Sequence, residues 1–151
     1  MKTEFSSSGA GKRRQAFQCN ATMHGPVRTL MVDQSAAVLE ALKRFFQEQS
    51  DFAVVGMATN GEEAVRQAAE LSPDLVVMDH VLPGMDGLMA TRRIKGGKSP
   101  PVVIIFALED SKGCRLAAKA AGADAVVGKV PQAVSTLRAA IRRAFPGAKF
   151  A

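Results

Sequence analysis

From residue 27 onward, short runs of apolar residues alternate with longer segments in which apolar residues recur every three or four positions. A short uninterrupted apolar run is typical of a strand buried on both faces, whereas the wider spacing is typical of a helix with one buried face. The pattern predicts five buried strands, at residues 30–32, 52–58, 75–78, 102–106 and 125–127. A helix is predicted after each strand, with inner faces formed in turn by Val38, Leu39, Leu42, Phe45 and Phe46; Ala64, Val65, Ala68 and Leu71; Leu88, Thr91 and Ile94; Leu116, Ala117 and Ala120; and Val134, Leu137 and Ile141.

The alternation of strands and helices indicates the fold class. Strands that are apolar throughout need cover on both faces, and helices placed between parallel strands provide it. The sequence therefore predicts an α/β protein with a doubly wound, five-stranded parallel sheet, (βα)5. Thr59 and Glu62 have the spacing of a capping box and mark the start of the second helix. In such a sheet, ligands bind at the carboxyl ends of the strands, near the point where the strand order reverses.

Length and charge add a domain boundary. The chain has 151 residues, 47% of them hydrophobic, and a net charge of +6, which fits one ordinary globular domain. Residues 1–26 are rich in Ser and Gly and carry four basic residues against one acidic residue, so half of the net charge lies there. We interpret residues 1–26 as a disordered basic extension and residues 27–151 as the domain. The domain itself is only mildly basic, so nucleic acid is not an expected partner.

Cysteine placement and the length of the apolar runs exclude several classes. Cys19 and Cys114 belong to no CxxC pair and no His cluster, which argues against a disulfide framework and a zinc module. The longest apolar run, residues 102–108, is far below the roughly 18–20 residues that span a bilayer, and residues 1–26 lack the apolar region of a signal peptide. We expect a reduced, cytoplasmic protein without membrane contact.

Polar residues stand where three of the predicted strands end. Asp33 follows the first strand, Asp79 the third, Ala107 the fourth and Lys129 the fifth. Two carboxylates that face each other raise each other's pKa, and a divalent cation held by hard oxygen ligands removes that repulsion. A Lys on the same edge would pair with a carboxylate or with a phosphoryl group bound to it. The sequence therefore predicts a Mg²⁺ site at this edge of the sheet.

The stretch DLVVMDHVLPGMDG at residues 74–87, with Val32-Asp33 upstream and Ala121-Gly122-Ala123 ahead of Lys129, resembles the receiver domain of bacterial two-component response regulators. The resemblance extends from residue 27 to about residue 145. It implies a flavodoxin-like fold. Because few residues follow it in the sequence, we expect a stand-alone protein of the chemotaxis-regulator type. Such a protein receives a phosphoryl group from a sensor histidine kinase or a phosphotransfer protein, and it is not an enzyme beyond assisting its own phosphorylation and dephosphorylation.

The resemblance also implies roles for individual residues. Asp79 would be the phosphoacceptor, and Lys129 would contact the phosphoryl group. Asp33, Asp79 and the backbone carbonyl of Val81 would hold Mg²⁺. These roles are chemically consistent, because a carboxylate nucleophile forms an acyl phosphate when cations offset its repulsion from the incoming phosphoryl group.

Some positions depart from the family pattern and indicate a partly degenerate site. Most receivers have a second acid after the first, where this chain has Gln34, whose neutral amide is a doubtful metal ligand. The Ser or Thr that follows the fourth strand is replaced by Ala107, or by Phe106 if the alignment shifts by one residue. Neither side chain has a hydroxyl. The aromatic switch position on the fifth strand is Val126.

Two hypotheses follow for the function. In the first, the chain is a phosphoacceptor that signals by protein–protein contact, to a downstream target or as a homodimer. The surface used would be that of the fourth helix, fifth strand and fifth helix, at about residues 112–145, with Arg138, Arg142 and Arg143 facing solvent or a partner.

In the second hypothesis, the chain is a pseudo-receiver, a docking or dimerisation module that phosphorylation does not switch. Gln34 and Ala107 favour it, whereas the retained Asp33, Asp79 and Lys129 oppose it. A flavin- or nucleotide-binding domain is a remote third interpretation, because the first strand is not followed by a Gly-rich turn that could hold phosphates.

Overall fold

The computed structural model describes residues 25–150 and contains a five-stranded parallel sheet in the order β2-β1-β3-β4-β5. The strands are β1 (Val27–Val32), β2 (Phe52–Ala58), β3 (Leu75–Asp79), β4 (Val102–Ala107) and β5 (Ala125–Gly128). The helices that follow them are α2 (Ala36–Gln47), α3 (Gly61–Leu71), α4 (Gly87–Lys95), α5 (Lys112–Ala120) and α6 (Ala133–Ala144). The predicted doubly wound α/β sheet is confirmed, and β2 has the bounds that its apolar run indicated.

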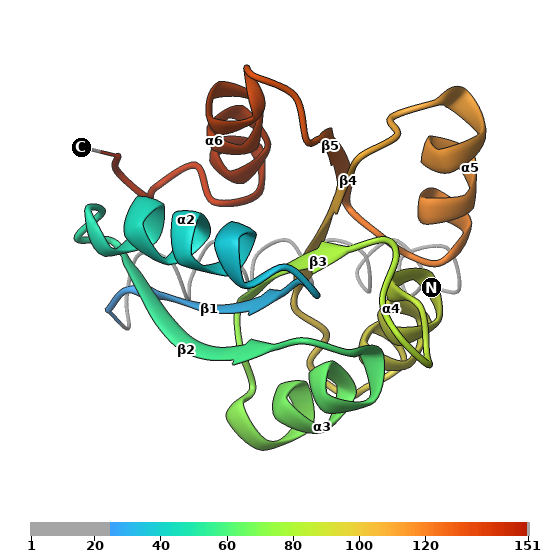
Figure 1. Cartoon of the computed structure of the whole chain (residues 1–151). Helices are drawn as coiled ribbons and strands as arrows, with labels where there is room; N and C mark the ends of the chain where they lie inside the picture. Colours follow the sequence, from blue (N-terminus) through green and yellow to red (C-terminus); the bar gives the residue numbers. More distant parts are fainter. Residues whose placement is uncertain (1–24, 151) are drawn as a thin grey trace, which may run out of the picture.

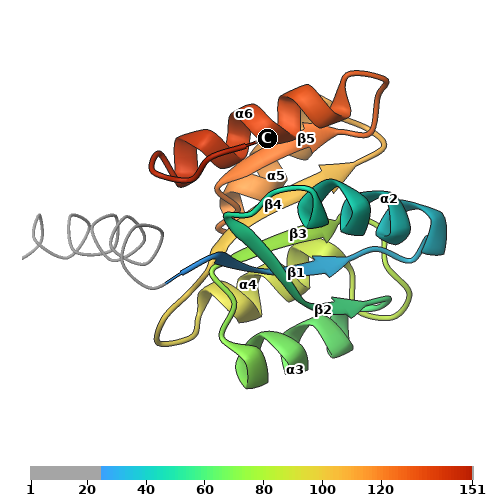
Figure 2. The ribbon, with the colours of Figure 1, turned by 90° about the vertical axis from the view of Figure 1, so that its left-hand side faces the viewer.

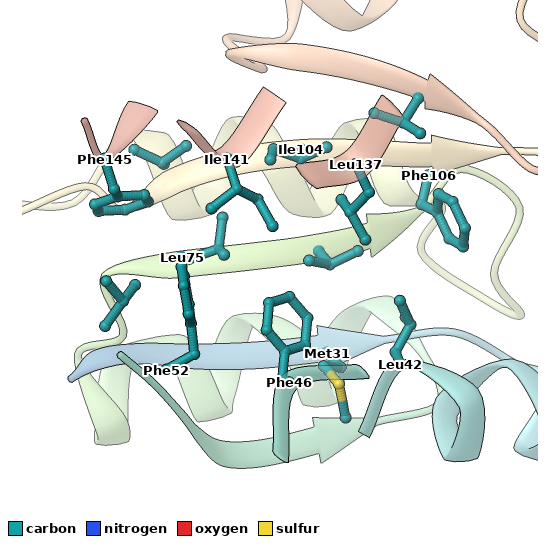
Figure 3. Close-up of a cluster of buried hydrophobic side chains, with 14 of the residues drawn as sticks. Met31, Leu42, Phe46, Phe52, Leu75, Ile104, Phe106, Leu137, Ile141 and Phe145 are labelled. Carbon is teal, nitrogen blue, oxygen red and sulfur yellow. The ribbon is translucent and has the colours of Figure 1, made fainter. Parts of the chain in front are cut away.

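The helices cover both faces of the sheet (Figure 1). Helices α2 and α6 lie on one face and α3, α4 and α5 on the other. Because successive strand residues point to opposite faces, each strand contributes to both sides. The cluster on the α2/α6 face, here called the first core, includes Met31, Phe46, Leu75, Ile104 and Ile141 (Figure 3). The second core, on the opposite face, is built around residues such as Leu30, Val76 and Ile105.

The parallel strands bring their carboxyl ends to one edge of the sheet (Figure 2). From β1 the chain moves to β2 on one side and then crosses back to β3 on the other side of β1. The strand order therefore reverses between β1 and β3, where a ligand is expected in this architecture. Asp33 follows β1 and Asp79 ends β3, so the two acids predicted from the sequence stand at this point.

The start of α3 differs from the prediction by one residue. Asn60 is the N-cap, and its Oδ1 accepts a hydrogen bond from the backbone N of Glu63 at 2.8 Å. The capping box assigned to Thr59 and Glu62 is therefore wrong. Thr and Asn both favour N-cap positions, so the path of the backbone out of β2 decides between two adjacent candidates.

The inner face of α5 also differs from the prediction. Cys114 and Ala118 are buried, whereas Leu116 is 60% exposed and Ala117 and Ala120 are exposed as well. A nine-residue helix with one large apolar side chain carries too little periodicity to fix its inner face. Small side chains at positions 114 and 118 let this helix pack closely on the sheet.

Two further expectations concern the N-terminal extension and the lack of membrane contact. The extension predicted at residues 1–26 lies outside the described residues except for the last two. In the part of the chain that the structure describes, no helix is long and apolar enough to cross a bilayer.

Candidate functional site

Asp33 is held at the end of β1 by the turn into α2. Its side chain is buried, and its backbone N donates to the carbonyl of Ala58 at the end of β2, at 3.1 Å. Its Oδ1 accepts a hydrogen bond from the backbone N of Ser35 at 2.8 Å. The Ser35 hydroxyl in turn caps α2 by accepting from the backbone N of Val38 at 3.3 Å. The helix start therefore fixes the orientation of this carboxylate.

Asp79 is positioned by the loop that follows β3. Gly84 in this loop has a φ of +73°, a left-handed conformation that side chains other than glycine rarely adopt. Asp86 is the N-cap of α4 and accepts from the backbone N of Met89 at 2.8 Å. At Gly87, a Cβ atom would overlap the carbonyl oxygen of Asp79. The Gly and Asp residues of this motif therefore bring the start of α4 against the backbone of Asp79.

Lys129 links the two acids from the end of β5. Its backbone N donates to the carbonyl of Ala107 at 2.7 Å, which extends the pairing of β4 with β5. Its Nζ lies 2.6 Å from Oδ2 of Asp33 and 3.0 Å from Oδ1 of Asp79. All three side chains are at least largely buried. The structure thus brings together the two carboxylates and the ammonium that the strand ends predicted.

The electrostatics of this group are unbalanced, because two buried carboxylates share one ammonium. Burial raises the pKa of the Asp79 carboxyl, the hydrogen bond from Lys129 lowers it, and the nearby charge of Asp33 raises it further. The net direction is upward. A raised carboxyl pKa means that further positive charge at this position would be favourable.

Gln34 and Val81 lie at the same edge. The side-chain Nε2 of Gln34 donates a hydrogen bond to the backbone carbonyl of Val81 at 3.0 Å. This contact joins the residue after Asp33 to the loop after Asp79. The Val81 carbonyl, expected to hold Mg²⁺, and the amide of Gln34, a doubtful ligand, are thus partners of each other.

The donor set fits Mg²⁺. Asp33, Asp79 and the Val81 carbonyl offer hard oxygen ligands, and the site has an excess negative charge. Among residues 25–150, no group of three or more His, Cys, Asp and Glu side chains is placed to hold a metal. A cation here would be held by two carboxylates and a carbonyl, with less charge than a site with three acids provides.

The two switch positions named from the sequence, Ala107 and Val126, both lie on the face of the second core, whereas Phe106, the alternative to Ala107, lies on the other face. Ala107 is buried in the second core, away from α2 and α6. Phe106 belongs to the first core and pairs with Asp79 across β3 and β4. The Nζ of Lys129 lies 5.6 Å from the centre of the Phe106 ring. Phe106 is therefore the β4 side chain beside the site, and Val126 is half-buried against the second core.

One contact was not anticipated. His80 Nδ1 lies 3.8 Å from Sγ of Cys114, which is in the first turn of α5. His80 is half-buried. Burial raises the pKa of the Cys114 thiol, and Asp110 and Glu109 raise it further. The pairing depends on how α5 packs, which no local sequence signal encodes.

A groove of about 360 Å³ lies between α2 and α6 and reaches the site. Its lining is almost entirely apolar, apart from Lys129 at one end, and includes Phe45, Phe106 and Val130. Val134 was predicted on the inner face of its helix, but it is 53% exposed and lines this groove.

A comparison with family models identifies residues 29–142 as a response regulator receiver domain. The chain is 36% identical over 118 residues to protein-glutamate methylesterase/protein-glutamine glutaminase 5 of Myxococcus xanthus, covering 78% of this chain and 34% of that protein. It is 41% identical over 88 residues to the transcriptional regulatory protein LiaR of Bacillus subtilis, covering 57% of this chain and 42% of that protein. The chain thus spans about a third to two fifths of the length of these relatives.

Solved structures agree with the family model. The response regulator domain of Thermotoga maritima CheB superposes with a TM-score of 0.74 at 33% identity, covering 79% of this chain and 96% of that one. A LuxR-family response regulator from Aurantimonas superposes equally well, with a TM-score of 0.74 at 33% identity, covering 82% and 88%. The predicted flavodoxin-like fold and the family resemblance are both confirmed, and the comparisons lend no support to a pseudo-receiver. The chain belongs to the response regulator receiver domains of two-component signalling systems.

Proposed function

We propose that this receiver accepts a phosphoryl group on Asp79 from a sensor histidine kinase or a phosphotransfer protein. The observation that carries the proposal is the position of Lys129 Nζ, which contacts both Asp33 and Asp79 at the reversal point of the sheet. In the transfer, an Asp79 carboxylate oxygen bonds to phosphorus while the bond from phosphorus to the donor's imidazole nitrogen breaks. Lys129 then moves from the carboxylates to the phosphoryl oxygens, whose charge it offsets.

Asp33, Asp79 and the Val81 carbonyl would hold Mg²⁺, with Gln34 a doubtful fourth contributor. When bound, the cation shields the carboxylate from the charge of the incoming phosphoryl group. Asp33, fixed by Ser35, keeps its carboxylate directed at the same space as Asp79 and Lys129. The protein therefore contributes by placing the charges of Asp33 and Lys129 around the Asp79 carboxylate that receives the phosphoryl group.

We further propose that phosphorylation is weakly coupled to the α5-β5-α6 surface. Neither Phe106 nor Ala107 has a hydroxyl that could follow a phosphoryl group, and Val126 is not aromatic. The signal would leave by contact of this surface with a downstream protein or a second copy. Leu116, exposed on α5, together with Arg142 and Arg143 on α6, offers apolar and basic contacts there.

The remaining assignments follow from this function. We infer a cytoplasmic location, where a soluble phosphodonor domain is accessible. Residues 27–151 would form the receiver domain, preceded by the basic extension of residues 1–26. The esterase or glutaminase activity in the names of some relatives is not carried over, because the chain spans only about a third of those proteins. The chain would instead act as a phosphoacceptor that assists its own phosphorylation and dephosphorylation.

The test is incubation with acetyl phosphate and Mg²⁺, followed by intact-protein mass spectrometry. We expect the gain of one phosphoryl group in the unmutated chain and none in Asp79→Asn. Glu70→Gln is a control, because Glu70 forms an exposed ion pair with Arg66 away from the site. An unmutated chain that gains no mass under any Mg²⁺ concentration would contradict the proposal and favour a docking module.

A further inference from the structure

The oxygen atoms assigned to a cation already have partners within the chain. Oδ2 of Asp33 and Oδ1 of Asp79 both contact Nζ of Lys129, at 2.6 and 3.0 Å. Oδ1 of Asp33 accepts from the backbone N of Ser35, at 2.8 Å. The Val81 carbonyl accepts from the Gln34 amide, at 3.0 Å. The chain thus supplies donors for this site from its own side chains and backbone.

The contact between Gln34 and Val81 differs from the others because it connects two loops through neutral groups, whereas each of the others involves a carboxylate. The two residues are 47 positions apart, and each follows a strand at the centre of the sheet. Val81 is 63% exposed, so burial of its side chain does little to hold this part of the loop. The hydrogen bond from Gln34 therefore restrains the Val81 carbonyl from across the edge of the sheet.

The chemistry of an amide makes this restraint compete with a cation. The Nε2 group is a donor and occupies one of the two lone pairs of the carbonyl oxygen, and it approaches from the residue next to Asp33, the side on which a cation held by Asp33 would lie. For Gln34 to offer its Oε1 to a cation beside Val81, the amide would have to turn over and lose the hydrogen bond. An acid at position 34 has no such donor and would attract the cation directly.

Resting on the function proposed above, we propose that Gln34 is a positioning residue with a specific effect on cation binding. It holds the Val81 carbonyl and the loop after Asp79 in place without metal, and Mg²⁺ binds only as this hydrogen bond breaks. Gln34 therefore weakens Mg²⁺ binding by competing for Val81, in addition to lacking a charge. A competitor for the Val81 carbonyl and a weak Mg²⁺ ligand make opposite predictions for Gln34→Ala. Removing a competitor tightens Mg²⁺ binding, whereas removing a ligand weakens it.

The experiment is a Mg²⁺ titration by isothermal calorimetry of the unmutated chain, Gln34→Ala and Gln34→Asp. Calorimetry is needed because the chain has no Trp and no Tyr to report binding by fluorescence. We expect Gln34→Ala to bind Mg²⁺ about two- to tenfold more tightly than the unmutated chain, as expected for removal of one competing hydrogen bond. Gln34→Asp should bind more tightly still. Weaker binding by Gln34→Ala would make Gln34 a ligand, and equal binding, or none by any of the three, would also overturn the proposal.

A second readout needs no metal. In EDTA, amide hydrogen exchange in the loop after Asp79 should be faster in Gln34→Ala than in the unmutated chain. Gln67→Ala is the matched control, because Gln67 also donates from Nε2 to a backbone carbonyl, that of Met57 at 2.8 Å, on the edge strand β2. This control should leave both Mg²⁺ affinity and loop exchange unchanged, and unchanged exchange in Gln34→Ala would contradict the restraint.

The outcome is separable from that of the phosphorylation test. If the unmutated chain gains a phosphoryl group while Gln34→Ala leaves affinity and exchange unaltered, the role of Gln34 fails and the phosphoacceptor function stands. If the affinity and exchange differences appear but no variant with Asp79 gains mass, the role of Gln34 stands and the phosphoacceptor function fails.

Discussion

At the scale of single residues, Asp79 is where stability and function oppose each other. Its carboxyl is largely buried next to a second carboxylate, and the pKa of Asp79 is raised above its ordinary value of 3.8, chiefly by burial. A group with a raised folded-state pKa favours the folded state most at low pH, below 3.8. That contribution is lost as the pH rises through the folded-state pKa, so ionised Asp79 makes the metal-free protein less stable at neutral pH.

This argument predicts the effect of Asp79→Asn on folding. Without Mg²⁺ at pH 7, the variant should be more stable than the unmutated chain by about 1 kcal/mol, in the usual range for relieving strain at a functional site. Lys129 then pairs with Asp33 alone, so charge is balanced. The difference should shrink as the pH is lowered towards 4, because the unmutated carboxyl becomes protonated.

Urea denaturation followed by far-ultraviolet circular dichroism at pH 4 to 8 measures this difference. Glu70→Gln should alter stability little at any of these pH values, because its partner Arg66 is exposed. An Asp79→Asn variant that is less stable at pH 7 than at pH 4, relative to the unmutated chain, would show that the ion pair with Lys129 outweighs burial.

At the scale of secondary-structure elements, α4 is tied to the site by the close approach of its first residue. A Cβ atom at Gly87 would overlap the backbone carbonyl of Asp79, which a strand residue cannot move easily. Gly87→Ala should therefore cost about 2–3 kcal/mol of stability and displace the loop before α4.

Gly113 provides the matched control for this substitution, since it lies in the first turn of α5 as Gly87 lies in that of α4. A Cβ atom at Gly113 meets nothing nearer than the Ser111 hydroxyl, at 3.9 Å. Gly113→Ala should be stabilising by about 0.5–1 kcal/mol, because alanine favours the helix. Thermal unfolding by circular dichroism compares the two, and equal stability changes would contradict the close-packing argument.

The elements also indicate what sequence patterns can and cannot specify. The strands were predictable because buried strands are apolar runs, and with them the placement of Asp33, Asp79 and Lys129 at one edge. Only the start of β1 was missed, because Arg28 and Thr29 interrupt its apolar run. The inner face of α5 was not, since Leu116 is the only large apolar residue of that helix and it points outward. Contacts such as those of Gln34 with Val81 depend on the distance between loops, which has no local signature.

At the scale of the whole molecule, one rigid sheet separates two cores. The first core is extended by Phe150, whose ring centre lies 5.1 Å from that of Phe52. Arg138 covers the Phe150 ring at 5.6 Å. Phe106 is packed into this core beside the site, and Ala107 into the other core. Beside a phosphoryl group on Asp79, the last two residues of β4 are therefore both held in place by packing, one on each face of the sheet.

This architecture predicts a local response to phosphorylation. Neither Phe106 nor Ala107 has a side chain that can form a hydrogen bond to the phosphoryl group, so β4 has no side chain to draw the following loop inward. A weak contact between His80 and Cys114, at 3.8 Å, connects the Asp79 loop to α5. In amide NMR spectra of the protein with beryllofluoride and Mg²⁺, shifts should be confined to the strand ends, the loop after Asp79 and the first turn of α5.

The same spectra of Cys114→Ala and Asp79→Asn make the prediction specific. Cys114→Ala should lose the shifts in the first turn of α5 and keep those around Asp79, because it removes the connection without touching the acids. Asp79→Asn should give no shifts, because it cannot bind the beryllofluoride group. Large shifts across residues 115–127 in the unmutated chain would mean that the signal crosses the packed core without a hydroxyl, and weak coupling would then be wrong.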